Sequence, residues 1–225
     1  MKHFESRSFE RLHSEVAPHA LDLTISARRA ERFRQVLARR TVQITVVVDD
    51  CFDPHNATAV LRTCEAFGLD EIHVVTPRNR FAVNRKISQG AHLYTTVATH
   101  ESIEGAYATL RESGFRIVVA SLAADSVTDP HDLSADLESS PLALVFGNEE
   151  SGVSEEGLEQ ADGYFLVPMS GFTQSLNLSV TVGITLFSIR HIALSADLPG
   201  DMPVSTQRSR YDSWITRQSR RRQRE

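Results

Sequence analysis

The sequence has few of the features that mark membrane, secreted or disulfide-stabilised proteins. It contains only two cysteines in 225 residues, too few for a disulfide framework. Its longest apolar segment, 176–194, is interrupted by Asn, Ser, Thr, Arg and His residues, so it lacks the run of about 18 apolar residues that a membrane span needs. The N-terminal segment carries acidic residues and no apolar stretch of the kind found in secretory signals. We therefore expect a cytoplasmic protein without a membrane partner.

The motifs of several common enzyme classes are also absent. No G-x-G-x-x-G follows a strand-like run, and G-x-x-x-x-G-K-[ST], H-E-x-x-H and G-x-S-x-G do not occur. These absences weigh against Rossmann-type dehydrogenases and methyltransferases, P-loop nucleotide hydrolases, zinc proteases and serine hydrolases. The nine histidines show no metal-ligand spacing, so we expect no metal in the chemistry.

The net charge of −5 is unevenly distributed along the chain. Residues 1–40 carry nine Lys and Arg against five Asp and Glu, and residues 207–225 carry seven Arg against two acidic residues. Between them, residues 41–206 include eight basic and 22 acidic residues. Basic ends on an acidic body are typical of a protein whose ends contact a polyanion. An Arg-rich tail that is only solvated is the alternative interpretation.

Alternating strand and helix patterns predict the fold class. β-branched apolar runs predict buried strands, and apolar positions at helical spacing predict the helices between them. A basic helix over 26–40, with Ser26 as its N-cap, is expected before the first strand. The expected strands are 44–48, 71–75, 116–121, 142–146 and 164–167, and the expected helices are 56–67, 102–112, 154–161 and 176–193. We predict an α/β domain at 41–195, with a mainly parallel sheet and helices on both faces, between extensions at 1–40 and 196–225.

Ligands of such sheets bind beyond the carboxyl ends of the strands, where three polar loops are expected. The first loop leads into a helix that carries Asn56 and Arg62. Asn56 is suited to cap this helix. Arg62 is either a solvated charge or a cation for an external anion, because the positive end of the helix dipole disfavours a cation in the helix's first half.

The second and third loops follow later strands. In the second, Gly147 permits close approach to the main chain, and Glu149 places a carboxylate at the end of a strand. In the third, Ser175 is expected to cap a long apolar helix, which leaves Asn177 inside the helix without a structural reason. Taken singly, each loop is also consistent with ordinary scaffold.

Together, in this order and spacing, the loops resemble the three motifs of the SpoU/TrmH family of the SPOUT methyltransferase superfamily. The block D-P-H-N-x-x-A-x-x-R-T (53–63) resembles the first motif, F-G-N-E-x-x-G-V (146–153) the second, and V-P-M-x-G-x-x-Q-S-L-N-L-S-V (167–180) the third. The likeness covers about 41–195. The basic helix and the C-terminal arm resemble the branch of the family that methylates guanosine 18 in the D-loop of tRNA.

The resemblance implies a deep trefoil knot near the C-terminal part of the domain, a homodimer, and methyl transfer from S-adenosylmethionine to an RNA ribose 2′-hydroxyl. It implies that the functional polar residues are Asn56, Arg62, Glu149, Ser175 and Asn177. By position, the residues expected to line the cofactor pocket are Ser121, Gly147, Val167, Met169 and Leu176. The cationic arms expected to hold tRNA phosphates include Arg28, Arg32, Arg39, Arg220, Arg221 and Arg222.

The family mechanism gives the arginine matching Arg62 the deprotonation of the ribose hydroxyl, assisted by an RNA phosphate. A free guanidinium has a pKa of about 12.5, so a neutral guanidine near pH 7 costs roughly 7 kcal/mol. Positioning a phosphate and stabilising an alkoxide is physically easier for a cation, and the role of Arg62 as a base stays open. The alternatives for the whole chain are the same chemistry on rRNA or another tRNA nucleotide, and a non-catalytic RNA-binding protein of the same fold.

Overall fold

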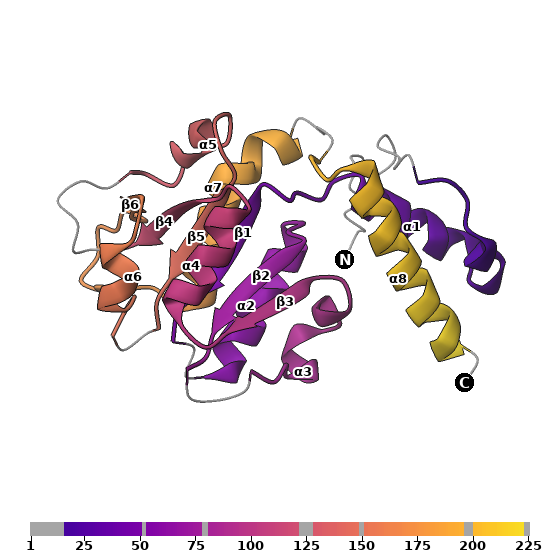
Figure 1. Ribbon diagram of the computed structural model, residues 1–225, viewed down its shortest axis with the longest axis horizontal. Helices are drawn as coiled ribbons and strands as arrows, with labels where there is room; N and C mark the ends of the chain where they lie inside the picture. Colours follow the sequence, from indigo (N-terminus) through magenta and orange to yellow (C-terminus); the bar gives the residue numbers. More distant parts are fainter. Residues whose placement is uncertain are drawn as a thin grey trace. The chain divides into compact units, whose positions relative to one another are not determined.

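The chain folds into two compact units (Figure 1). The computed structural model describes residues 16–50, 53–77, 81–121, 128–148, 151–195 and 200–222. Residues 42–191 form one unit, which we call the sheet unit. Residues 1–41 and 192–225 form the other, which we call the terminal unit. Within the described residues, no helix is long and apolar enough to cross a membrane.

Six strands form the centre of the sheet unit. They are β1 (Ile44–Val48), β2 (Glu71–Val75), β3 (Thr96–His100), β4 (Arg116–Ala120), β5 (Leu142–Phe146) and β6 (Gly163–Phe165). Their order across the sheet is β3-β2-β1-β5-β4-β6, and all five pairings are parallel. The central strand β1 is buried along its whole length, which explains its continuous β-branched sequence. The predicted α/β fold with a parallel sheet is therefore confirmed.

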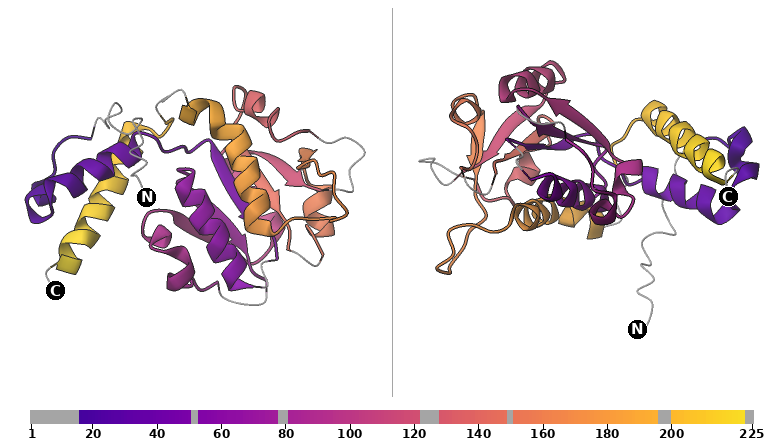
Figure 2. Two further views of the ribbon diagram at one scale, coloured as in Figure 1. Left: turned by 180° about the vertical axis from the view of Figure 1, so that it is seen from behind. Right: turned by 90° about the horizontal axis from the view of Figure 1, so that it is seen from below.

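Helices cover both faces of this sheet, as predicted (Figures 1 and 2). Because strand side chains alternate, Val46 faces one layer and its neighbour Val47 faces the other. The layer that contacts Val46 contains α2 (Pro54–Ala66) and α7 (Leu178–Ser195). The opposite layer contains α4 (Ile103–Glu112) and α6 (Glu155–Glu159). Three short elements complete the unit: α3 (Arg85–Ser88), η3 (Ala91–Leu93) and α5 (Leu133–Asp136). The trefoil knot stays a prediction.

Some predicted boundaries were wrong. The helix α2 begins at Pro54 instead of Asn56, because Asp53 is the N-cap and its carboxylate accepts a hydrogen bond from the His55 N–H at 2.8 Å. Proline suits the first helical position, where its missing N–H is not needed. The expectation that Asn56 caps the helix was therefore wrong. Strand β3 was not predicted, since it lies at the edge of the sheet, is only partly buried and has no continuous apolar run.

The terminal unit consists of η2 (Ala20–Thr24), α1 (Ala27–Leu37) and α8 (Val204–Arg222). As predicted, the Ser26 hydroxyl caps α1 by accepting from the Arg29 N–H, and the buried face of α1 contains Ala30, Phe33 and Leu37. The Phe33 ring packs edge-on against Trp214 of α8, with 5.6 Å between the ring centroids. Helix α8 was not predicted, because its many arginines resemble a solvated tail.

Two arginines of the terminal unit have partners inside it. Arg34 forms an ion pair with Asp22, and the guanidinium of the buried Arg40 lies 5.0 Å from the centroid of the Trp214 ring. Asp22 also accepts hydrogen bonds from the Tyr211 hydroxyl and from the His19 N–H. Although burial raises the pKa of Asp22, these donors stabilise its carboxylate, and the net effect lowers that pKa. Some charged side chains of the terminal unit, such as Arg34 and Asp22, therefore stabilise the unit itself.

Candidate active site

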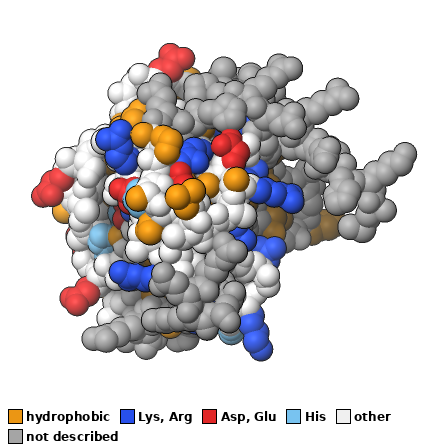
Figure 3. Space-filling view, turned by 90° about the vertical axis from the view of Figure 1, so that its right-hand side faces the viewer, with side chains coloured by type: hydrophobic (Ala, Val, Ile, Leu, Met, Phe, Trp, Pro, Cys, Tyr) orange, Lys and Arg blue, Asp and Glu red, His pale blue; other side chains and the backbone are white. Residues whose placement is uncertain are grey.

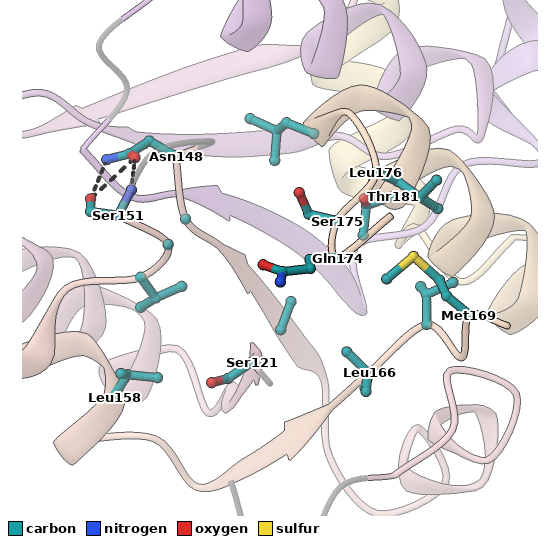
Figure 4. A pocket seen from close by; sticks show the side chains of 16 residues that line it. Ser121, Asn148, Ser151, Leu158, Leu166, Met169, Gln174, Ser175, Leu176 and Thr181 are labelled. Carbon is teal, nitrogen blue, oxygen red and sulfur yellow. Dashed lines mark hydrogen bonds between the residues drawn. The ribbon is translucent and has the colours of Figure 1, made fainter. Parts of the chain in front are cut away.

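A cavity of about 380 Å³ lies at the carboxyl ends of β4, β5 and β6 (Figure 4). Its walls include Ser121 directly after β4, Gly147 directly after β5, and Val167 in the segment after β6. The stretch 174–178, which leads into α7, supplies further lining residues. Most of the lining side chains are apolar, and the volume is within the usual range for small-molecule sites. This position is the one expected for a ligand of a parallel α/β sheet.

The segment after β5 forms a tight turn along the cavity. Asn148 and Gly152 exchange two backbone hydrogen bonds of 3.2 and 3.1 Å. The Asn148 carboxamide also accepts from the Ser151 N–H at 2.8 Å (Figure 4). A Cβ atom on Gly147 would lie 1.9 Å from the carbonyl carbon of Gly152, which no side chain can accommodate. Gly147 therefore lies close to the main chain of Gly152, and it also lines the cavity.

A buried carboxylate holds this turn in place from the neighbouring strand. Asp49, directly after β1, is 2 % exposed and accepts from the backbone N–H and the hydroxyl of Ser154, at 2.8 and 2.6 Å. The Ser154 hydroxyl in turn caps α6 by accepting from the Gly157 N–H. Burial, and then the negative charge of Asp49, raise the pKa of the Tyr107 phenol, which donates to the Gly157 carbonyl at 3.0 Å. Asp49 thus fixes the start of α6 and the end of the cavity turn.

The loop between β6 and α7 forms the other side of the cavity. Met169, Ser175 and Leu176 line it, and the Gln174 and Ser175 side chains project towards its interior (Figure 4). The residues that were predicted from their positions to contact a cofactor therefore all line this cavity. They are Ser121, Gly147, Val167, Met169 and Leu176. Their contact with a cofactor stays a prediction.

The prediction that Ser175 caps the long helix was wrong. The helix α7 starts at Leu178, and the Asn177 side chain accepts from the Ser179 N–H at 3.0 Å and from the Ser179 hydroxyl at 2.7 Å. Asn177 thus has the position and bonding of an N-cap residue. This gives Asn177 the structural reason that the sequence did not reveal, and it leaves Ser175 available to the cavity.

Asn56 and Arg62 lie on α2, outside the lining of the cavity. Arg62 is the ninth of the 13 residues of α2, so the expectation that it lies in the helix's first half was wrong. Asn56 is in the first turn, and its N–H donates to the Asp53 carbonyl at 3.0 Å. Arg62 is exposed, and within the described residues it has no ion-pair partner. The loop before α2 contacts the cavity turn, because the Asn148 carboxamide lies 3.5 Å from the Asp50 carbonyl. Glu149 lies outside the described residues.

The arginines predicted to bind RNA differ in their surroundings. Arg28, Arg32 and Arg220 are exposed, whereas Arg39 is half-buried and its guanidinium lies 3.5 Å from the Gln35 carbonyl. Arg221 and Arg222 belong to α8, but their side chains lie outside the described part of the chain. Figure 3 shows exposed Lys and Arg side chains together with carboxylates on the face that it presents.

The cavity also has lining residues that were not predicted. Asn148, Ser151 and Gln174 are polar members of this set, and each lies inside one of the three motifs. The motif itself was the signal that could have identified them. Among the described residues, no group of three or more His, Cys, Asp or Glu side chains is placed to hold a metal ion.

A parallel α/β unit with a small-molecule cavity at its strand ends defines an α/β ligand-binding or enzyme domain, and comparison with known proteins gives its family. Residues 43–187 match the model of the SpoU rRNA Methylase family. The match covers more than half of the chain, so the chain belongs to the SpoU methylase family.

Individual relatives agree with this assignment. The tRNA (guanosine(18)-2′-O)-methyltransferase of Thermus thermophilus is 36% identical over 170 residues, which are 76% of this chain and 86% of the relative. The protein of the same name from Escherichia coli K12 is 33% identical over 71% of this chain and 68% of its own length. The A. aeolicus TrmH/SpoU tRNA modifying enzyme superposes with a TM-score of 0.74 at 29% identity, over 85% of this chain and 96% of that one. An AdoMet-bound rRNA methyltransferase from Sinorhizobium meliloti superposes with a TM-score of 0.59 at 26% identity, over 70% of this chain and 60% of that one.

Proposed function

We propose that the protein transfers the methyl group of S-adenosylmethionine to the 2′-hydroxyl of guanosine 18 in tRNA. The observation that carries this proposal is the cavity, because it is lined by segments of the second and third family motifs and by all five positions expected to contact the cofactor. The sheet unit would be the catalytic part, corresponding to the predicted domain at 41–195. The extensions at 1–40 and 196–225 would hold the RNA.

The residues around the cavity fit S-adenosylmethionine. Apolar side chains such as Leu158, Leu166 and Leu178 provide surface for a flat adenine ring, and Ser121, Gln174 and other polar groups are available for its hydrogen bonds. When bound, this cofactor supplies a methyl group on a sulfonium sulfur, which an oxygen nucleophile can attack. On this wall of the cavity, Gly147 lies against the main chain of Gly152, and Asp49 accepts a hydrogen bond from the Ser154 N–H.

In this proposal Arg62 acts on the RNA. An exposed guanidinium with no ion-pair partner among the described residues is available to a phosphate. Such a cation orients the reacting nucleotide and stabilises negative charge that develops on the ribose oxygen. Most of the acceleration then comes from alignment of two bound substrates, because the reaction needs an in-line approach of the hydroxyl to the methyl group. Asn56, which precedes Arg62 by six residues on α2, would orient the ribose or the guanidinium.

The choice of guanosine 18 in tRNA rests on the relatives, several of which carry that activity in their names at 33–36% identity. The uneven charge supports RNA as the acceptor, because the terminal unit is basic and the sheet unit acidic. The same chemistry on rRNA or on another tRNA nucleotide is the second candidate, since the S. meliloti neighbour is an rRNA methyltransferase.

We also propose that the protein is a homodimer. Val180, Ile184 and Phe187 lie at i, i+4 and i+7 on α7, so they share one face, and they are 46, 38 and 53 % exposed. An apolar stripe of this kind is costly in water and marks an interface. A second copy of the chain is the occupant that we expect. Sedimentation should give a dimer for the wild type and a monomer for Ile184→Glu, and a wild-type monomer at micromolar concentration would contradict the proposal.

The decisive experiment for the activity uses labelled S-adenosylmethionine and two RNAs without modifications, a tRNA and an rRNA. We expect label in tRNA, and nuclease mapping should locate it on the ribose of guanosine 18. A tRNA with deoxyguanosine at position 18 is the matched control, because it lacks only the attacked hydroxyl. Label in rRNA or at another nucleotide would select the second candidate. Cofactor binding without transfer to any RNA would indicate a non-catalytic RNA-binding protein.

A further inference from the structure

The few basic side chains of the sheet unit are divided between internal and external roles. The unit has eight Lys and Arg residues against 20 Asp and Glu. Six of the eight have described side chains. Three of these six bind inside the unit: Arg111 pairs with Asp162 at 3.2 Å, Arg116 with Asp136, and Arg190 donates to the Phe67 carbonyl at 2.5 Å. In an acidic unit, this is the expected behaviour of a cation.

The other three are Arg62, Arg85 and Lys86. All three are exposed, and none has an ion pair or a side-chain hydrogen bond within the described residues. They are located on only two helices, α2 and α3, which pack against each other. Among the described basic side chains of the unit, those without an internal partner are thus grouped on two neighbouring helices.

A hydrogen bond between the two helices places α3 next to the middle of α2. The Asn84 N–H, at the start of α3, donates to the hydroxyl of Thr58 at 3.2 Å. Thr58 lies one helical turn before Arg62 on α2. The start of α3, with Arg85 and Lys86, is therefore beside the turn of α2 that leads to Arg62.

The two cations of α3 are carried on a fixed turn. The Asn84 side chain caps α3 by accepting from the N–H groups of Lys86 and Ile87, at 3.0 and 3.4 Å. At the other end of α3, the hydroxyl of the buried Ser88 lies 2.7 Å from Nδ1 of His92. Because the Asn84 cap holds the backbone N–H groups of this turn, Arg85 and Lys86 lose little backbone entropy when they bind.

We propose that Arg85 and Lys86 form a phosphate-binding surface, the α3 surface, which contacts the backbone of the substrate RNA next to the nucleotide that Arg62 serves. This proposal rests on the proposed function and adds a second RNA contact to it, within the sheet unit. RNA fits this surface because its backbone carries phosphates at regular intervals. Two exposed cations next to a third can therefore bind successive phosphates. In a unit of negative net charge, such a group of exposed cations is a place where an RNA phosphate is attracted and not repelled.

The test is the double variant Arg85→Gln, Lys86→Gln of the full chain, with RNA affinity measured at several salt concentrations. Each lost phosphate contact should reduce the slope of log K against log salt by about 0.7–0.9, so we expect a reduction of about 1.5 and a loss of affinity on the order of tenfold near 0.15 M salt. Binding of S-adenosylmethionine and the far-ultraviolet circular dichroism should stay at wild-type values.

Two controls separate the α3 surface from general charge. Arg116→Gln removes one positive charge whose partner is Asp136, and it should leave the salt slope unchanged. The variant Arg85→Lys, Lys86→Arg keeps both charges and should restore the slope. A wild-type slope in the double variant, with methyl transfer by the wild type intact, overturns the α3 surface and leaves the proposed function standing. Absence of transfer and of RNA binding in the wild type overturns the proposed function itself.

Discussion

The sheet unit and the terminal unit have opposite charge. The sheet unit has eight basic and 20 acidic residues, a formal net charge of −12, whereas the terminal unit has 16 basic and nine acidic residues, a net charge of +7. Long-range attraction of a polyanion therefore comes from the terminal unit, while the cavity belongs to the unit that repels one. In a protein that methylates RNA, one unit can thus bind the RNA while the other carries out the reaction.

The interiors of the units differ as well. The sheet unit is stabilised by apolar side chains on both faces of a buried parallel sheet. In the terminal unit, aromatic rings and charged groups share the interface between α1, η2 and α8, as the contacts of Asp22 with Arg34 and Tyr211 show. Polar interiors depend on complete sets of partners, whereas apolar ones depend on packing. The two units should therefore respond to different substitutions.

The largest expected effect concerns Arg62, the exposed cation on α2. Arg62→Ala should lower kcat by about 10²–10³, the cost of removing one donor that stabilises transition-state charge. Binding of S-adenosylmethionine should not change, since Arg62 is outside the cavity lining. Single-turnover methyl transfer at saturating RNA measures this. Arg62→Lys keeps the positive charge but lacks the planar guanidinium group, and it should recover part of the rate. Full activity of Arg62→Ala would remove Arg62 from the site.

The second prediction concerns pH and the stability of the sheet unit. His73 on β2 is 5 % exposed, its Nδ1 lies 2.9 Å from Nε2 of His100, and burial, followed by the nearby His100, lowers the pKa of His73 from 6.5 to about 4. Between these values the unfolded chain binds a proton that the folded chain does not. The free energy of unfolding should therefore fall by about 1.4 kcal/mol per pH unit as the pH decreases from 6.5 towards 4.

Urea unfolding between pH 7.5 and 4.5 measures this dependence. His73→Phe removes the titrating group and should give a flatter profile than the wild type, whatever its absolute stability. The difference between the two profiles isolates His73 from carboxylates that titrate in the same range. Identical slopes would mean that the pKa of His73 is the same in the folded and the unfolded chain.

The third prediction tests the polar interior of the terminal unit. Asp22→Ala removes the acceptor for Arg34, Tyr211 and the His19 N–H, so it should destabilise this unit by about 2 kcal/mol. Hydrogen exchange of α1 and α8 amides should accelerate, while exchange in the sheet does not change. Tyr211→Phe, which removes one hydroxyl, should cost about 1 kcal/mol. Equal acceleration in both units would show that they unfold together.

These contrasts also explain which parts of the molecule the sequence predicted. The strands 44–48, 71–75 and 142–146 were predicted to the residue, because strands covered on both faces are rich in apolar and β-branched residues. Edge strand β3 and helix α8 were missed, since neither has a strong apolar period in its sequence. Helix α8 is stabilised by contacts with residues that are distant in the chain, such as Phe33 and Arg40. A local sequence pattern does not predict such contacts.

The candidate site shows the same division. Gly147, Val167 and Leu176 were placed at the cavity because they follow strands or belong to a motif, and parallel strands bring such segments together. Gln174 and Ser151 were missed, and the sequence did not reveal that the Asn177 side chain caps α7. Local hydrogen bonds of this kind decide where a helix begins. Where several Ser and Asn residues lie close together, the sequence does not specify which of them is the N-cap. The part of Asn177 in the chemistry stays a prediction.

The smallest expected effect concerns the exposed arginines of the terminal unit. The double variant Arg28→Gln, Arg220→Gln removes one exposed cation from α1 and one from α8. If these contact phosphates, the affinity for tRNA should fall on the order of tenfold near 0.15 M salt, and the salt slope should decrease by about 1.5. The rate at saturating RNA should stay at the wild-type value, because neither residue takes part in the chemistry. Arg28→Lys, Arg220→Lys keeps the charge and serves as the control. A fall in kcat comparable to that of Arg62→Ala would mean that the terminal unit positions the reacting nucleotide, and the separation between holding RNA and reacting with it would then be wrong.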